Sequence, residues 1–101
     1  MAKSILQDER ECYLCNLLYG THNHYNLHEH HVFQGTANRR KSEHHGLKVY
    51  LCAEHHNTSQ YAVHFNPDLD LRLKVIAQTE FEKEHSREEF MKEFGRSWKD
   101  D

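Results

Sequence analysis

Two short metal-ligand motifs constrain the fold of this chain more than any other feature of its sequence. Cys12 and Cys15 form a CxxC motif, and Cys52 and His55 form a CxxH motif. A two-residue spacer lets both side chains of a motif converge on one ion, so two such motifs supply four tetrahedral ligands. A chain of 101 residues has room for one small core, which a metal can stabilise. The sequence therefore predicts structural zinc on these four residues.

Two other uses of the cysteines fit less well. The chain has three cysteines, an odd number that no disulfide framework uses completely. A C2H2 finger has the right spacing for Cys12, Cys15 and His28, but it needs a second histidine three to five residues later. Residues 32 to 34 are Val, Phe and Gln, so this alternative fails.

The charge pattern limits how such a chain can bind nucleic acid. Its net charge is -3 with histidine neutral, so any binding must be local. Basic residues concentrate at Arg39, Arg40 and Lys41, where we expect phosphate contacts. No apolar run approaches the length of a membrane span, and we expect a cytoplasmic protein with no membrane partner.

The middle of the chain predicts two strands and a short helix. Leu27 to Phe33 would place alternate side chains on opposite faces, and Gly35 would end that strand. Residues 36 to 46 are polar and basic, which predicts a loop or arm. Leu47 to Cys52 is rich in strand-favouring residues, and residues 53 to 60 suit a short helix carrying His55 and His56.

The last third of the chain predicts two scaffold helices. Asn66, Pro67 and Asp68 form a helix start, and Ser86 with Glu89 matches a capping box before a second helix that ends at Gly95. The residues expected to face the core are Leu69, Leu73, Ile76, Ala77 and Phe81 in the first helix and Phe90, Met91 and Phe94 in the second.

Most of the eleven histidines lie between His22 and His64. Adjacent residues on a strand point to opposite faces, so His30 and His31 can divide a hydrolytic task between a metal and a water. His56 on the short helix would then complete the metal site. We expect His22, His24, His28, His44, His45 and His85 to be solvated.

The segments HHVFQG (30 to 35) and LCAEHH (51 to 56) resemble the HNH nuclease signature. More narrowly, HHVFQGTANRRKSE, GLKVYLCAEHH, AVHFNP and EEFMKEFGRSW are similar to small phage proteins related to the recombination-enhancement nucleases. The resemblance covers most of the chain from Cys12 onward. It implies a metal-dependent endonuclease that hydrolyses DNA, with recombinase-coated DNA as a possible partner and the bacterial host cytoplasm as its location.

The resemblance also implies a role for each site residue. His31 would be the general base, His30 and His56 would bind a catalytic divalent metal (Mg²⁺, Mn²⁺, Ni²⁺ or Zn²⁺), and His64 is a further ligand candidate. The middle Asn of the HNH pattern is Leu47 here, so the group that orients the base is unassigned. Asn38 or a backbone carbonyl could serve.

We expect an α+β domain spanning residues 1 to 101. It would comprise a small ββα-metal (HNH) core with a zinc knuckle over about residues 12 to 66 and two C-terminal helices over about 67 to 98. The alternative is a non-catalytic zinc module that binds DNA or a protein. The missing Asn and the acidic net charge favour that alternative, whereas three convergent histidines argue against it.

Overall fold

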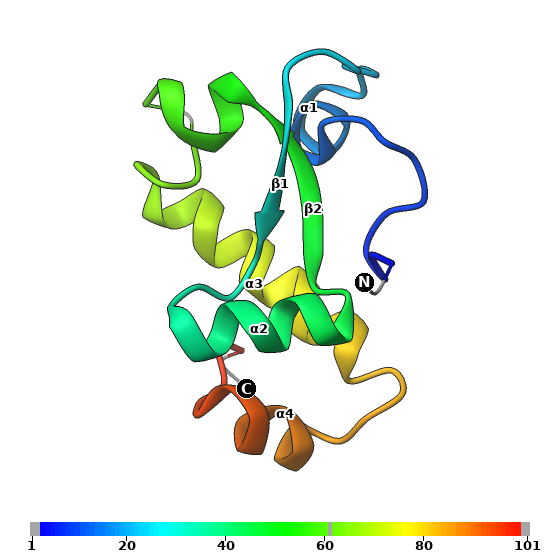
Figure 1. Ribbon diagram of the computed structural model, residues 1–101, viewed down its shortest axis with the longest axis vertical. Coiled ribbons are helices and arrows are strands. Elements are labelled where there is room, and N and C mark those ends of the chain that lie inside the picture. The colour runs from blue at the N-terminus through cyan, green and yellow to red at the C-terminus, as the bar shows by residue number, and fades with distance from the viewer. Residues whose placement is uncertain (1–2, 61, 100–101) are drawn as a thin grey trace.

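The computed structural model describes residues 3–60 and 62–99, which form a small α+β fold (Figure 1). The fold class expected from the sequence is confirmed at this level. Its elements in chain order are α1 (Tyr13–Tyr19), β1 (Leu27–His31), α2 (Thr36–His45), β2 (Lys48–Cys52), the π-helical turn η1 (Glu54–Thr58), α3 (Pro67–Phe81) and α4 (Arg87–Phe94).

The two strands pair as an antiparallel hairpin, with Leu27 opposite Cys52 and His31 opposite Lys48. β1 ends at His31, two residues before the expected position, although Val32 still donates its amide to the Leu47 carbonyl before the chain enters the core. Val32 is fully buried there. The hairpin therefore presents His28 and His30 on one face and His31 on the other, as the alternation predicted.

Residues 36 to 45 form helix α2, so the expectation of a loop or arm was wrong. The segment has almost no apolar residues, and polar contacts stabilise the helix instead. The buried Ser42 hydroxyl accepts from the Phe33 amide at 3.1 Å and donates to the Phe33 carbonyl at 3.0 Å. Gly46 ends the helix in a left-handed conformation that favours glycine.

Helix α1 was also not expected, and residues 3 to 12 before it contain no helix. The Cys12 sulfur caps the first turn of α1 by accepting from the Cys15 amide, and Gly20 ends the helix with a positive φ. α1 is thus fixed at the residues that carry the CxxC motif.

Both C-terminal helices begin where the sequence predicted. The Asn66 side chain caps α3 by accepting from the Leu69 amide, and Ser86 forms a capping box with Glu89 at α4. Phe90 and Phe94 are buried as expected, but Met91 is 45% exposed, so its inward placement was wrong. A one-residue step rotates a helix by about 100°, which turns Met91 away from the face that Phe90 presents.

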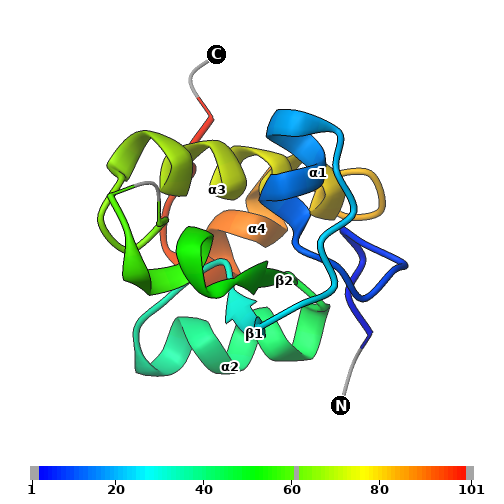
Figure 2. The ribbon, with the colours of Figure 1, turned by 90° about the horizontal axis from the view of Figure 1, so that it is seen from above.

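The core lies between the hairpin and these helices. Phe33 packs against Phe90, Phe94 and Trp98, with ring centroids 4.7 to 5.3 Å apart. Seen from above, the hairpin lies between α2 on one side and α3 on the other (Figure 2). In the described ranges, no helix is long and apolar enough to cross a membrane.

Candidate metal centres

The two predicted knuckle motifs meet in one buried Cys3His cluster. The start of α1 supplies Cys12 and Cys15, the end of β2 supplies Cys52, and η1 supplies His55. All three cysteines are free thiols, and all four side chains belong to buried residues. The cluster therefore joins the N-terminal segment to the end of the hairpin.

The distances within this cluster fit a tetrahedral zinc ion. The Nδ1 atom of His55 lies 3.5, 3.4 and 3.3 Å from the sulfurs of Cys12, Cys15 and Cys52, and the last two sulfurs are 3.8 Å apart. Zn–S bonds of about 2.3 Å and Zn–N bonds of about 2.0 Å in a tetrahedron place sulfur and nitrogen about 3.5 Å apart and two sulfurs about 3.8 Å apart. The cluster can bind a structural metal such as zinc.

Its surroundings also suit thiolate ligands. The amide of Cys15 points at the Cys12 sulfur, and the Asn23 side chain donates to the Cys15 sulfur at 3.7 Å. Burial and the neighbouring Cys12 thiol raise the pKa of Cys15 to about 12, and burial lowers the pKa of His55. A bound cation would compete with the proton of the Cys15 thiol and take its place on the sulfur.

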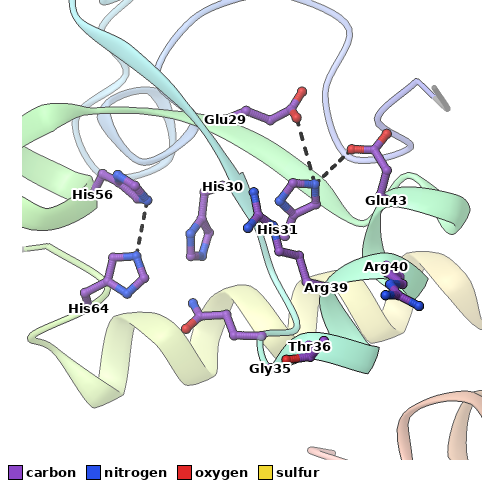
Figure 3. Close-up of a pocket in the computed structure, with 11 residues that line it drawn as sticks. Glu29, His30, His31, Gly35, Thr36, Arg39, Arg40, Glu43, His56 and His64 are labelled. Atoms are coloured by element: carbon purple, nitrogen blue, oxygen red, sulfur yellow. Dashed lines mark hydrogen bonds and ion pairs between the residues drawn. The ribbon is translucent and has the colours of Figure 1, made fainter.

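Three further histidines converge beside the hairpin, in a second cluster (Figure 3). His30 comes from β1, His56 from η1 and His64 from the segment before α3, and their rings face one another. The Nε2 atoms of His56 and His64 are 3.2 Å apart, and one nitrogen from each of the three residues lies within 4.8 Å of the others. We call this set the histidine triad.

His30 is the buried member of the triad. It is 2% exposed, and among the described residues no partner lies within hydrogen-bond distance of its Nε2 atom. Burial, with the neighbouring His56 and His64, lowers the pKa of His30 to about 3. A neutral, buried imidazole nitrogen without a partner is costly in an ordinary core, but it is the state in which histidine binds a metal.

His28 supports the triad from outside. Its Nδ1 atom lies 2.9 Å from Nδ1 of His56, and the two rings meet edge to face. The sequence placed His28 among the solvated histidines, but it is half-buried. Residues two apart on a strand share a face, so strand alternation places His28 beside His30. This signal was present in the sequence. The contact occupies one nitrogen of His56 and leaves the other facing His64.

His31 lies at the end of β1 and makes a different contact. Its Nε2 atom is 2.9 Å from a carboxylate oxygen of Glu43 in α2 and 3.8 Å from one of Glu29. Glu43 also binds Lys48 at 2.6 Å, and hydrogen bonds from Lys48 and His31 lower its pKa to about 2. Sequence reasoning missed Glu43 because it read residues 36 to 46 as a loop.

His30, His31, His56 and His64 all line one pocket of about 930 Å³ (Figure 3). Arg39 and Arg40 line the same pocket from α2, whereas Lys41 donates instead to the backbone carbonyl of Glu93. The pocket thus brings together the histidine triad, His31 and two arginines, and the third predicted basic residue points elsewhere.

The remaining histidines lie outside this pocket. His22 binds Glu11, His45 binds Glu93 and His85 binds Glu89 through single contacts of 2.7 to 3.1 Å, while His24 and His44 are exposed. His45 is half-buried against Phe81, so its expected solvation was wrong. Comparison of the chain with protein-family models, curated proteins and solved structures gave no match.

Proposed function

We propose that this chain is an HNH-type, metal-dependent endonuclease that hydrolyses DNA phosphodiester bonds, with a ββα-metal core formed by the β1–β2 hairpin and η1. One observation carries the proposal. Two adjacent histidines on β1 have different partners in the same pocket. His30 forms the triad with His56 and His64, whereas His31 contacts Glu43. A hydrolase needs this division between a metal ligand and a base.

Each group of the pocket has a distinct task in such a reaction. His31 takes a proton from the attacking water, and Arg39 and Arg40 contact the phosphate backbone. His30, His56 and His64 would hold the divalent cation. His28 contacts the Nδ1 atom of His56 and so orients the His56 ring. The cation, when bound, supplies positive charge to the phosphate oxygens.

The ligand chemistry favours a transition metal. Neutral imidazoles suit zinc, nickel and iron, whereas magnesium prefers oxygen ligands. The three triad ligands are all imidazoles, and burial together with His64 and His28 lowers the pKa of His56. We therefore expect nickel or zinc to support activity at lower concentrations than manganese, and manganese at lower concentrations than magnesium.

The wider setting follows from the resemblance of the sequence. We propose a phage-encoded protein that acts in recombination or DNA processing in the host cytoplasm, on bare or recombinase-coated DNA. The arginines of α2 support a nucleic-acid substrate, because they lie on the pocket that holds the triad.

The rival function is a zinc module that binds DNA or protein without cutting. Leu47, at the position of the HNH asparagine, is fully buried in the core and offers no polar side chain to the pocket. The net charge of -3 points the same way. In that rival the histidines would be a relic or a second metal site, and only the second metal site gives a reason for the buried His30 nitrogen without a partner.

Cleavage of supercoiled, nicked and single-stranded DNA by the zinc-loaded protein tests the proposal, with Mg²⁺, Mn²⁺, Ni²⁺ or Zn²⁺ titrated in. His31→Ala should lower the cleavage rate by about 10²- to 10⁴-fold at every metal concentration while leaving DNA affinity intact. His56→Ala should lose metal affinity, so that activity returns in part at high metal concentration. The matched control is His44→Ala, on the exposed surface of α2, which should cleave like the wild type. Cleavage by His31→Ala at the wild-type rate would refute the assignment of the base.

A further inference from the structure

The contact between His31 and Glu43 determines which nitrogen of the imidazole carries the proton. Nε2 of His31 lies 2.9 Å from Oε1 of Glu43, which is hydrogen-bond distance. An ionised carboxylate only accepts hydrogen bonds, so Nε2 must be the donor. The lone pair of the neutral ring is then on Nδ1, the nitrogen that can accept a proton from water.

Glu43 is itself held in place by a buried ammonium group. Nζ of Lys48 lies 2.6 Å from Oε2 of Glu43 and 3.5 Å from Oε2 of Glu29, and its side chain is 7% exposed. Lys48 stands directly opposite His31 in the strand register. The two oxygens of the Glu43 carboxylate thus contact two different partners, His31 from β1 and Lys48 from β2.

The other groups that could orient His31 are less suitable. Glu29 is 3.8 Å from Nε2, beyond hydrogen-bond distance. Asn38 does not line the pocket, and the Leu47 carbonyl accepts the amide of Val32. A metal ion on Glu29, His31 and Glu43 would have to compete with Lys48, whose ammonium lies against both carboxylates.

We propose that Glu43 is the positioning residue for His31, with Lys48 as its anchor, and that this pair replaces the asparagine of the HNH pattern. The geometric part of this proposal, the tautomer of His31, stands on the contacts alone. The catalytic part rests on the proposed nuclease function.

The tautomer can be measured without any cleavage assay. Nitrogen chemical shifts of the His31 ring, recorded in the zinc-loaded protein at a pH where the ring is neutral, should show Nε2 protonated and Nδ1 unprotonated. Glu43→Ala should turn this into a mixture of both tautomers. The control is Glu93→Gln. It removes the carboxylate whose Oε1 atom lies 2.7 Å from Nε2 of His45 on α2, and it should leave the His31 signals unchanged. A wild-type ring protonated on Nδ1, or one that Glu43→Ala leaves unchanged, would overturn the proposal.

A double-mutant cycle tests the catalytic part. Glu43→Ala should lower kcat by about 100-fold, since general-base catalysis contributes about 10²- to 10⁴-fold, while DNA affinity and metal affinity stay near wild type. The double variant His31→Ala/Glu43→Ala should be no slower than His31→Ala alone, because Glu43 acts through His31. Full activity of Glu43→Ala, or an additional loss in the double variant, would overturn the positioning role. If the wild type cuts no DNA, the proposed function fails, and the nitrogen shifts then decide the tautomer by themselves.

Discussion

Loss of one sulfur ligand from the Cys3His cluster should remove a large part of the stability of this domain. Cys52→Ser keeps the size of the side chain but replaces a strong zinc ligand with a weak one. The cluster bridges Cys15 and Cys52, which are 37 residues apart. A cross-link that closes a loop of this length lowers the entropy of the unfolded chain by an amount worth about 4 kcal/mol.

That loss is large compared with the total stability of a small domain, about 5 to 15 kcal/mol. For a chain of this size, each kcal/mol shifts the melting temperature by about 4 to 8 °C, so Tm should fall by about 15 to 30 °C. Thermal unfolding followed by circular dichroism, with zinc content measured on the same samples, gives both numbers. A strong chelator should have the same effect on the wild type. The exposed His24→Ala variant is the control for a substitution outside the cluster, and its zinc content and Tm should stay at the wild-type values.

A wild-type protein that is folded without zinc and keeps its Tm after chelation would refute this reasoning. It would mean that the four side chains converge for packing alone. A Cys52→Ser variant with full zinc content and unchanged Tm would lead to the same conclusion.

Three further predictions concern other parts of the chain. Reversing the charge of Arg39 and Arg40 to Glu should weaken DNA binding equally at all sequences and reduce the slope of log affinity against log salt by about 2, because each phosphate contact contributes about 0.9. Gly46→Ala should destabilise the protein more than Gly20→Ala, as measured by urea unfolding. Both glycines have a positive φ, at which an alanine costs about 1 kcal/mol. Only at Gly46 would the added Cβ also overlap the Lys3 carbonyl. Zinc affinity, measured by competition with a chelator, should rise with pH up to the raised pKa of the Cys15 thiol at about 12, because thiol protons compete with the ion.

Each of these predictions has a clear contrary result. An unchanged salt slope would make the two arginines ordinary solvated residues. Charge reversal at the exposed Lys83, in the turn after α3, provides the control. Equal losses at Gly46 and Gly20 would mean that the N-terminal segment does not pack against Gly46. A zinc affinity independent of pH would show that the cysteines bind no metal as thiolates.

The sequence was sufficient for the parts of the fold that depend on local rules. The strand alternation correctly separated His30 from His31, and the capping residues Asn66 and Ser86 correctly marked both C-terminal helices. The CxxC and CxxH spacing correctly grouped four side chains that lie far apart in the chain. The strand and helix predictions succeeded because each depends on neighbours within a few residues. The grouping of the two motifs succeeded because a tetrahedral ion needs four ligands and each motif supplies two.

Helix α2 could not be found by hydrophobic periodicity, because it has no apolar stripe. Tertiary contacts stabilise it, through Ser42 on the Phe33 backbone and through His45 and Lys41 on Glu93. The flanking Gly35 and Gly46 were the available signal, since glycine commonly ends a helix. Missing α2 also meant missing Glu43, which only a helix brings beside His31.

The boundary of η1 shows a second limit of local rules. A short helix was expected over residues 53 to 60, and the structure has a π-helical turn at Glu54–Thr58. Within it, His55 belongs to the Cys3His cluster and the neighbouring His56 belongs to the histidine triad. Two metal-capable groups thus meet on one turn, and the sequence alone did not reveal how that turn would be wound.

Cleavage of a short DNA duplex in water enriched with heavy oxygen tests the central claim most directly. The zinc-loaded protein with Ni²⁺ or Mn²⁺ should release fragments whose new terminal phosphate carries one heavy oxygen atom, as read by mass spectrometry, because the attacking group is a water activated by His31. His31→Ala should release the labelled product about 10²- to 10⁴-fold more slowly. Absence of any labelled fragment from folded, zinc-loaded wild type with every metal and DNA form would contradict the account and favour the non-catalytic zinc module.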